Sequence, residues 1–411
     1  MRLIVQKYGG TSVGSPERIR KVAERLLETQ RDDCRVVAVI SAMGGETDKL
    51  LRLAREVSPR PDEREMDLLL ATGEQAATAL VAMAVNALGG RAISLSGAQA
   101  GILTDRVHTK AKIAHITPRQ IHELLSDDYI VVVAGFQGQT PEGETTTLGR
   151  GGSDLTAIAL AGALGADVCQ IYTDVDGVYS CDPRVVGEAM KMEEIAYDEL
   201  LELAGSGAKV MQSRAVEFAK KFGVEFEVRS SFNRNPGTLA KEETRSMEDV
   251  VIRGISIERA QAKVTLDDVP DRPGVASRIF SAVSSANILV DVIVQSVSDR
   301  NTTDISFTIH EQDLARVEEL LAPVVDEVGA KRLISHGGMA KLSVVGIGMR
   351  SHSGVAARLF DCLGQGNINI ELISTSEIKI TVVIAEKDAE RAAQLTHNAF
   401  GLATYANAPH A

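Results

Sequence analysis

The hydrophobic positions of the first 235 residues alternate between two patterns. Short continuous apolar runs are separated by longer stretches in which apolar residues recur at helical spacing. This alternation predicts an α/β domain with a parallel-rich sheet sandwiched by helices, because strands buried on both faces read as unbroken apolar runs. The predicted strands are residues 3–6, 35–40, 130–136 and 168–173, and the predicted helices are residues 16–28, 62–88, 154–164 and 205–222.

Small and polar residues follow each predicted strand. Lys7, Ser41, Gly135 and Asp174 stand at these ends, where parallel sheets bind their ligands. Lys7 lies close before a Gly-Gly pair. Paired glycines let backbone amides approach a phosphate closely, and a nearby lysine neutralises its charge. The P-loop pattern G-x-x-x-x-G-K-[ST] is absent, so this interpretation depends on the position at a strand end.

The motif richest in candidate chemistry is the segment 145–154, Thr-Thr-Thr-Leu-Gly-Arg-Gly-Gly-Ser-Asp, which leads into a predicted helix. Backbone N–H groups in such a turn and the positive end of the helix stabilise anions. Arg150 adds a cationic fork, and Ser153 and Asp154 supply a hydroxyl and a carboxylate at the helix start. An ordinary loop with an N-cap is the alternative, but it accounts for fewer of these residues.

Two charged residues lie at unusual places in predicted helices. Glu74 interrupts the apolar face of the helix 62–88 and needs a partner if it is buried. The alternative is a solvated side chain at a helix kink. Lys209 lies in the first turn of the helix 205–222, where a cation opposes the helix dipole, so a bound anion would explain it. A flexible surface lysine is the alternative there.

The segment 173–184 superficially resembles a calcium loop. Val178 and Val185 occupy positions at which an EF-hand needs oxygen ligands, so that interpretation fails. A nucleotide loop fits the segment better. The residues expected to contact nucleotide are Tyr179 on a base, Arg184 on phosphate, and Asp174 and Asp182 near ribose or metal-bound water.

Length and charge narrow the function classes. A chain of 411 residues is long enough for two or three domains. Its net charge of −12, without a long basic run, argues against nucleic acid or an anionic membrane surface as partner. The amino terminus shows no long apolar core with a cleavage site, and no window approaches the roughly 18 apolar residues of a membrane span. We therefore expect a cytoplasmic protein.

The cysteines and histidines give no metal signal. The 4 cysteines form no CxxC pair, which argues against a zinc site or a disulfide framework. His108, His115 and His122 recur every seven residues, but Pro118 interrupts any helix that would join them. We expect solvated polar positions there and no metal site made by the protein alone.

An internal repeat follows a polar linker at residues 236–260. Gly274-Val-Ala276 recurs as Gly354-Val-Ala356, and Asn287-Ile288 as Asn367-Ile368, at a constant offset of 80. Each copy predicts strand, glycine turn, helix, strand, strand, helix, which is an α+β unit of ferredoxin-like type. Such small units without polar catalytic clusters suggest binding rather than chemistry. The expected domains are a catalytic domain at 1–235 and repeats at 261–338 and 339–411.

Together these motifs resemble the bacterial aspartokinases, amino-acid kinases with tandem C-terminal ACT domains, over nearly the whole chain. In that family one ACT unit interrupts the other, so a last strand near residues 401–406 is expected to complete the first unit. The motifs that carry the resemblance are Lys7-Tyr-Gly-Gly-Thr-Ser12, Gly135-Phe-Gln-Gly138, Thr147-Leu-Gly-Arg-Gly-Gly-Ser-Asp154 and Tyr172-Thr-Asp-Val-Asp-Gly-Val-Tyr179.

The resemblance implies phosphoryl transfer from ATP to the side-chain carboxylate of L-aspartate, giving 4-phospho-L-aspartate. Mg²⁺ would be carried by ATP, and the reaction would open the biosynthesis of lysine through diaminopimelate, of threonine and of methionine. Catalytic roles fall on Lys7, Arg150, Asp154, Asp174 and Lys209. The implied ATP contacts are Lys7, Tyr8, Gly9, Gly10, Ser12, Thr173, Asp174, Tyr179, Asp182, Arg184, Lys209 and Val210. The implied aspartate contacts are Ser41, Thr47, Glu74, Arg150, Gly151, Ser153 and Asp154.

The same resemblance implies inhibition by L-lysine, L-threonine or both through the ACT units, which would also form a homodimer or higher oligomer. A glycine turn before a helix can hold an amino acid's carboxylate on its backbone amides. The second repeat lacks the aspartate and proline that precede this turn in the first, so we do not expect equal binding by both. The implied effector contacts are Asp271, Gly274, Val275, Ala276, Asn287, Asp291, Gln295, Asn367, Ile368, Asn369, Ser374 and Glu377.

Two other functions stay open at this point. The chain could be another amino-acid kinase, acting on glutamate or on a nucleotide such as UMP, although the first and third motifs together weigh against this. It could instead be a non-catalytic amino-acid sensor that keeps an inactive kinase fold. The intact Lys7, Arg150, Asp174 and Lys209 weigh against that second alternative.

Overall fold

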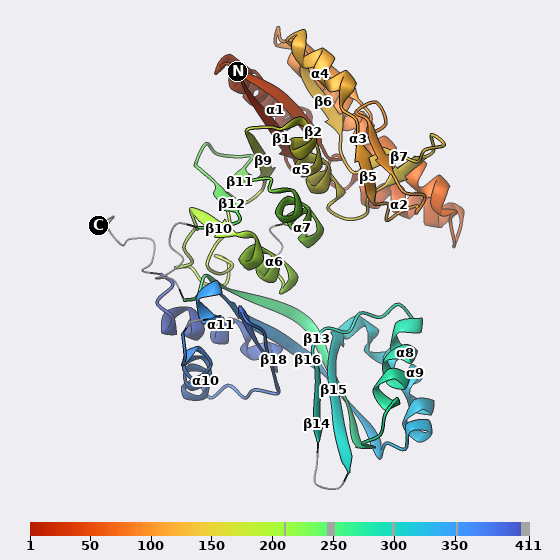
Figure 1. The fold of residues 1–411 in the computed structure, drawn as a ribbon, viewed down its shortest axis with the longest axis vertical. Coiled ribbons are helices and arrows are strands. Elements are labelled where there is room, and N and C mark those ends of the chain that lie inside the picture. Colours follow the sequence, from red (N-terminus) through yellow and green to blue (C-terminus); the bar gives the residue numbers. More distant parts are fainter. Residues whose placement is uncertain (209–210, 245–250, 298–300, 351, 404–411) are drawn as a thin grey trace. The chain divides into compact units, whose positions relative to one another are not determined.

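The computed structural model describes residues 1–208, 211–244, 251–297, 301–350 and 352–403. Lys209 and Val210 therefore lie outside the described residues. Part of the strand expected near 401–406 also lies outside the described residues. Residues 401–403, which are described, form a turn. The chain forms two units (Figure 1). The N-terminal unit comprises Met1–Val178, Lys191–Ala204 and Lys209–Arg245, and the C-terminal unit comprises Tyr179–Met190, Gly205–Ala208 and Ser246–Ala411.

An eight-stranded sheet forms the centre of the N-terminal unit, in the order β10-β12-β11-β9-β1-β2-β6-β3. All neighbours pair in parallel except β11 and β12, so the predicted parallel-rich sheet is confirmed. The strands are β1 (Arg2–Tyr8), β2 (Cys34–Ile40), β3 (Ala92–Leu95), β6 (Ile130–Ala134), β9 (Val168–Thr173), β10 (Glu194–Ala196), β11 (Phe226–Ser230) and β12 (Thr238–Lys241).

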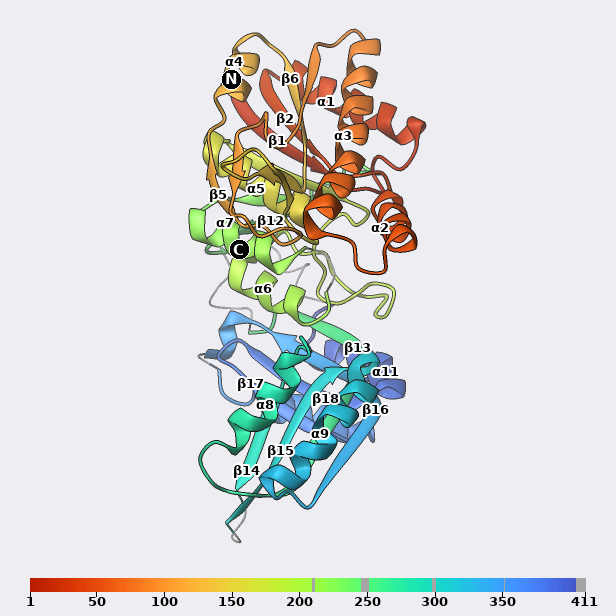
Figure 2. The same cartoon turned by 90° about the vertical axis from the view of Figure 1, so that its right-hand side faces the viewer.

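Helices cover this sheet on both faces, as predicted (Figure 2). Helices α1 and α3 pack on one face, where Leu26 and Val81 share an apolar cluster with alternate residues of β2 such as Ala38. Helix α5 packs against β1, β2 and β9 and also contacts α7. The helices are α1 (Pro16–Arg31), α2 (Glu46–Val57), α3 (Glu63–Ala87), α4 (Arg119–Ser126), α5 (Gly152–Leu164), α6 (Tyr197–Gly205) and α7 (Ser213–Phe222).

A smaller sheet, in the order β5-β4-β7-β8, leads the chain into α5. Two helix predictions are wrong in part. The helix predicted over 205–222 begins too early, because Gly205 is the last residue of the preceding helix α6 and α7 begins only at Ser213. No kink at Glu74 is seen, since α3 is one uninterrupted helix through that position. The small strands are β4 (Ile102–Thr104), β5 (Ile113–Ile116), β7 (Gln137–Gln139) and β8 (Thr145–Thr147).

Contrary to expectation, α3 has the length and mean hydropathy of a membrane-spanning helix. Half of its apolar window is buried inside the protein. Ala77 and Val81 pack there in the cluster with α1 and the sheet, and α3 also carries two buried carboxylates, Asp67 and Glu74. These are features of a core helix.

A six-stranded sheet, β14-β15-β13-β16-β18-β17, joins both repeats of the C-terminal unit. The two glycine-turn helices begin and end at an offset of 80, and Gly274 and Gly354 precede them at φ 96° and 95°. The predicted ferredoxin-like order is confirmed. The elements are β13 (Gly254–Pro270), α8 (Val275–Ser285), β14 (Ile293–Val297), β15 (Thr302–His310), α9 (Leu314–Val328), β16 (Arg332–Val345), α10 (Val355–Gln365), β17 (Leu372–Thr375), β18 (Lys379–Ala385) and α11 (Ala389–Ala399).

Two segments from elsewhere in the chain complete the core of the second repeat. Ile252 and Ile255 lie in the stretch predicted as a linker, yet they pack with α10, α11 and β18. Cys181 and Val186, from the segment after β9, join the same cluster. The stretch 236–260 is thus partly ordered sheet, with β12 near its start and the beginning of β13 near its end.

Candidate active site

The side chain of Lys7 marks the centre of the candidate site. Lys7 lies near the end of β1, and its Nζ is 2.6 Å from Asp154 Oδ1 in the first turn of α5. Both side chains are mostly buried, with 11% and 13% exposed. Asp154 Oδ1 receives no aligned hydrogen bond from a described residue, so the contact is an ion pair. It connects the first and third sequence motifs.

The glycine turn after β1 approaches neighbouring backbone closely. A Cβ atom on Gly10 would lie 2.7 Å from the Ala42 carbonyl oxygen, and the Gly44 amide donates to the Gly10 carbonyl at 3.1 Å. A Cβ atom on Gly9 would lie 3.5 Å from Lys7 Nζ. Only the Gly9 distance is an ordinary van der Waals contact, so Gly10 is the position at which glycine is needed for the close approach of two backbone segments, an arrangement that suits a phosphate.

The side chains of Tyr8 and Ser12, which belong to the same motif, contact other parts of the protein. Tyr8 is 1% exposed and stacks on Tyr172 with ring centroids 4.8 Å apart. Burial raises the pKa of the Tyr8 hydroxyl well above its usual value. The Tyr8 side chain therefore belongs to the core, which leaves only its backbone for ATP. Ser12 contacts Ser231 through their hydroxyl groups.

Glu74 is a buried carboxylate with one unsatisfied oxygen. The side chain is 4% exposed, and Oε1 accepts a 3.2 Å hydrogen bond from the Ala42 amide. Oε2 has no partner among the described residues. Burial raises the pKa of Glu74 to about 7, against the lowering effect of the Ala42 hydrogen bond. The alternative of a solvated Glu74 is wrong, and the free oxygen can accept a cationic group.

Arg150 projects from the turn between β8 and α5. Gly149 and Gly151 flank it at φ 77° and 66°, a region that favours glycine. A Cβ atom on Gly151 would also overlap the Gln212 side chain. Within the described ranges, the guanidinium group of Arg150 makes no ion pair or hydrogen bond. It is free to bind an anion bidentately.

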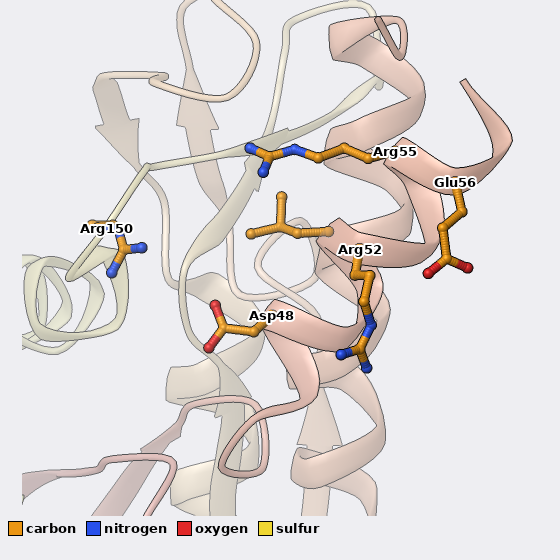
Figure 3. A pocket seen from close by; sticks show the side chains of 6 residues that line it. Asp48, Arg52, Arg55, Glu56 and Arg150 are labelled. Atoms are coloured by element: carbon orange, nitrogen blue, oxygen red, sulfur yellow. The ribbon is translucent and has the colours of Figure 1, made fainter. Parts of the chain in front are cut away.

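A cavity of about 400 Å³ lies between Arg150 and α2. Figure 3 shows the guanidinium groups of Arg55 and Arg150 pointing into the same space, whereas the Glu56 carboxylate points away. Arg52 and Arg55 were not among the residues predicted from the sequence, although their spacing of three places both on one face of a helix. The lining residues are Asp48, Leu51, Arg52, Arg55, Glu56 and Arg150.

The remaining residues expected near aspartate also lie at this edge of the sheet. Ser41 follows β2 and donates its amide to the Tyr8 carbonyl at 3.1 Å. Thr47 is in the first turn of α2. A Cβ atom on Gly135 would lie 2.7 Å from Ser153 Oγ, so glycine at the end of β6 leaves room for that hydroxyl. The parallel pairing of β2 with β6 thus brings Ser41 and Gly135 to neighbouring strand ends.

The predicted nucleotide loop is divided between the two units. Thr173 and Asp174 follow β9 in the N-terminal unit, where Thr173 Oγ1 donates to Asp174 Oδ1 at 3.1 Å. Tyr179, Asp182 and Arg184 belong to the C-terminal unit. The Arg184 guanidinium lies 2.7 Å from Asp182 Oδ2 and lowers the pKa of that carboxyl, so these two predicted nucleotide contacts pair with one another.

The residues expected to bind an effector lie in the turns, helices and strands of both repeats, and several of them already have partners within the protein. Asn287 and Asn367, at φ 57° and 51°, occupy equivalent left-handed positions after α8 and α10, and Asp271 donates its amide to Asn301. Asn369 donates to Glu371 at 2.9 Å, and Glu377 pairs with Arg350 at 3.0 Å. The others lie at the start of α8 (Val275, Ala276), on β14 (Gln295), after α10 (Ile368) and on β17 (Ser374).

Asp291 is already bound by a lysine. Lys341 Nζ on β16 contacts Asp291 Oδ2 and lies 2.7 Å from Glu258 Oε2. In the other repeat, Glu371 stands at the position equivalent to Asp291, and Lys263 Nζ on β13 lies 3.4 Å from its Oε2. A lysine from one repeat thus neutralises the carboxylate of the other in both directions.

No cluster of three or more His, Cys, Asp or Glu side chains suited to a metal ion occurs in the described part of the chain. The prediction that His108 is solvated is wrong. Its Nδ1 lies 2.8 Å from the buried Asp67 carboxylate. The sequence pattern of histidines alone could not identify this partner.

Comparison with known proteins identifies the family of this chain. Residues 2–230 match the amino acid kinase family, and residues 267–322 and 342–400 match the ACT domain. The chain is 51% identical over 403 residues to the aspartate kinase of Stutzerimonas stutzeri, covering 98% of both chains. It is 51% identical over 404 residues to the aspartokinase of Pseudomonas aeruginosa, again covering 98% of both.

Solved structures agree with this assignment. The E. coli aspartokinase III structure with aspartate and ADP is 26% identical, with a TM-score of 0.78, and the match covers 97% of this chain and 99% of that one. The structure of the same enzyme with lysine and aspartate also has a TM-score of 0.78 at 26% identity, covering 96% and 99%. The chain belongs to the aspartokinase family, as an amino-acid kinase followed by ACT domains.

Proposed function

We propose that the chain transfers the γ-phosphoryl group of MgATP to the side-chain carboxylate of L-aspartate, giving 4-phospho-L-aspartate. The observation that carries this proposal is that three charged groups lie at the same edge of the sheet. These are the Lys7–Asp154 ion pair, the Arg150 guanidinium, which has no partner among the described residues, and the buried Glu74 carboxylate, whose Oε2 has none there either. The relatives named as aspartate kinases support the same reaction.

This reaction requires neutralisation of negative charge rather than removal of a proton. A carboxyl group with a pKa of about 4 is already ionised at pH 7, so its attack on phosphorus needs no general base. Catalysis then depends on in-line positioning of two anions and on cations at the transferred group. Lys7, the glycine turn after β1 and the amino-terminal end of α5 supply this neutralisation, with Asp154 orienting Lys7. Mg²⁺ would add its charge when bound with ATP.

The aspartate pocket follows from the charges of its lining. Arg150 would bind the α-carboxylate through a bidentate pair, and Glu74 would accept the ammonium group with its free oxygen. Ser41, Thr47 and Ser153 would supply hydroxyl groups, and Gly151 a backbone amide. The nucleotide would be bound by Thr173, Asp174, Tyr179, Asp182, Arg184, Lys209 and Val210.

We further propose that lysine, threonine or both inhibit through the ACT units, which would also form a homodimer or higher oligomer. This regulation suits an enzyme that opens the cytoplasmic pathway to lysine, threonine and methionine. The structure of E. coli aspartokinase III with lysine and aspartate supports an amino-acid effector of this kind. An effector acts only through different affinities for active and inactive arrangements, so inhibition and turnover should separate by mutation.

A substrate panel tests the reaction. With MgATP, release of ADP measured by a coupled assay should depend on aspartate and be negligible with glutamate or UMP. Glutamate- or UMP-dependent release would indicate a different amino-acid kinase. A complete lack of ADP release with aspartate would favour the non-catalytic sensor.

Arg150→Lys should separate aspartate binding from ATP binding. Lysine keeps the charge but loses the bidentate fork, so the KM for aspartate should rise about tenfold or more, the loss of roughly 1.4 kcal/mol. The KM for MgATP should stay within about twofold of wild type. Arg20→Gln, which removes an exposed cation from α1, is the matched control and should change neither value. Equal losses for both substrates in Arg150→Lys would contradict the assignment.

Glu74 should make aspartate binding dependent on pH near neutrality. Its pKa of about 7 in the free enzyme means that the carboxyl is protonated below that pH and cannot pair with an ammonium group. Therefore kcat/KM for aspartate should fall about tenfold per pH unit below 7. Because the bound ammonium favours the ionised form, the corresponding pKa in kcat should be lower. Glu74→Gln should give a low, flat profile in this range; a profile that keeps the same limb would exclude Glu74.

Inhibition should depend on Asp291 while uninhibited turnover does not. Titration of lysine and threonine, singly and together, should inhibit wild type, and Asp291→Ala should weaken inhibition by at least one of them. Glu371→Ala, at the equivalent position of the other repeat, reports which repeat binds which effector. If neither amino acid inhibits wild type, the regulatory proposal fails. If both inhibit Asp291→Ala as they inhibit wild type, only this placement fails.

A further inference from the structure

Helix α3 carries a second carboxylate, Asp67, which is fully buried and accepts several hydrogen bonds. The proposed reaction assigns no role to it. The exposed fraction of Asp67 is 0%. Oδ2 lies 2.8 Å from His108 Nδ1, and the Thr109 amide lies 3.0 Å from both carboxylate oxygens. Thr147 Oγ1 donates to Oδ1. Three groups from two distant segments thus converge on one carboxylate of a helix.

Burying a charged group is costly unless hydrogen bonds compensate it. Asp67 therefore favours the single arrangement in which all these donors are present. Thr109 itself is a β-branched residue at φ 65°, a strained conformation that persists only where the surroundings hold it. The Asp67 carboxylate is the group that receives its amide.

The Arg150 turn begins directly at this network. Thr147 is the last residue of β8, three positions before Arg150. The Thr147 carbonyl accepts from the Ala111 amide at 2.9 Å. Arg214 then joins both segments, since it donates to the Leu148 carbonyl at 2.7 Å and to the Ala111 carbonyl at 2.8 Å. The backbone is held up to position 148, whereas the guanidinium of Arg150 has no partner among the described residues.

We propose that Asp67 is a positioning residue, which orients the Arg150 turn for aspartate through its hydrogen bonds to Thr147, Thr109 and His108. It does not touch the substrate. The inference rests on the proposed role of Arg150 in binding the α-carboxylate. A free guanidinium on a glycine-flanked turn would otherwise lose part of its binding energy to the ordering of that turn.

Adjacent threonines on β8 provide a matched pair of variants. Thr147→Val keeps the volume but removes the hydroxyl that donates to Asp67, and Thr147→Ser restores it. Thr146→Val removes a comparably buried hydroxyl, which pairs with Thr104 at 2.7 Å and does not contact Asp67. We expect Thr147→Val to raise the KM for aspartate about tenfold or more, because a hydrogen bond to a charged group is lost. Thr147→Ser and Thr146→Val should stay within about twofold of wild type.

A double-mutant cycle tests whether Asp67 acts through Arg150. Asp67→Asn should raise the KM for aspartate in wild type but add little in the Arg150→Lys background, because coupled residues are not additive. Equal effects in both backgrounds, or equal increases in the KM for aspartate and MgATP, would overturn the positioning role and leave a structural one.

Hydrogen exchange of the amides at 149–152 measures the order of the Arg150 turn independently of enzyme activity. Exchange there should become faster in Thr147→Val and Asp67→Asn and remain unchanged in Thr146→Val. Unchanged exchange in all three variants would overturn the proposal. If instead wild type showed no aspartate-dependent ADP release while the exchange pattern appeared as expected, the proposed reaction would fail and the orientation of the turn by Asp67 would remain.

Discussion

The ion pair between Lys7 and Asp154 is the interaction on which the candidate active site depends. It unites the end of β1, near the middle of the sheet, with the first turn of α5. The carboxylate compensates the desolvation of the lysine, and the positive end of the helix stabilises the carboxylate. A cation held in this way is preorganised, so a phosphate bound beside it would require little rearrangement. The adjacent glycines keep the space beside the amine free of side chains.

Helix α3 carries two buried carboxylates in contrasting environments. Asp67 receives donors from three groups, whereas Glu74 has one hydrogen bond and one free oxygen. The first arrangement satisfies both carboxylate oxygens and fixes the residues that donate to them. The second raises the pKa to about 7 and leaves an oxygen without a hydrogen-bond donor among the described residues. The two carboxylates of one helix therefore differ in how far the protein itself satisfies them.

Two ion pairs connect the repeats of the C-terminal unit. Lys341 from the second repeat contacts Asp291 of the first, and Lys263 from the first contacts Glu371 of the second. Both lysines lie on the central strands β13 and β16, which pair with one another. An effector whose ammonium group binds either carboxylate must therefore compete with an internal lysine, so its affinity depends on the arrangement of both repeats.

The sequence by itself determined the local structure of this protein. Apolar runs and helical spacing identified the central strands and most of their helices, and the offset of 80 identified the two ferredoxin-like units. Strand ends predicted that Lys7, Ser41 and Gly135 would meet, because parallel strands align such ends. Only tertiary structure decided the partners of Asp67 and His108 and the placement of residues 179–190 with the second repeat. Those outcomes depend on side-chain contacts between distant segments, such as the 80 positions between Asp67 and Thr147, for which periodicity carries no information.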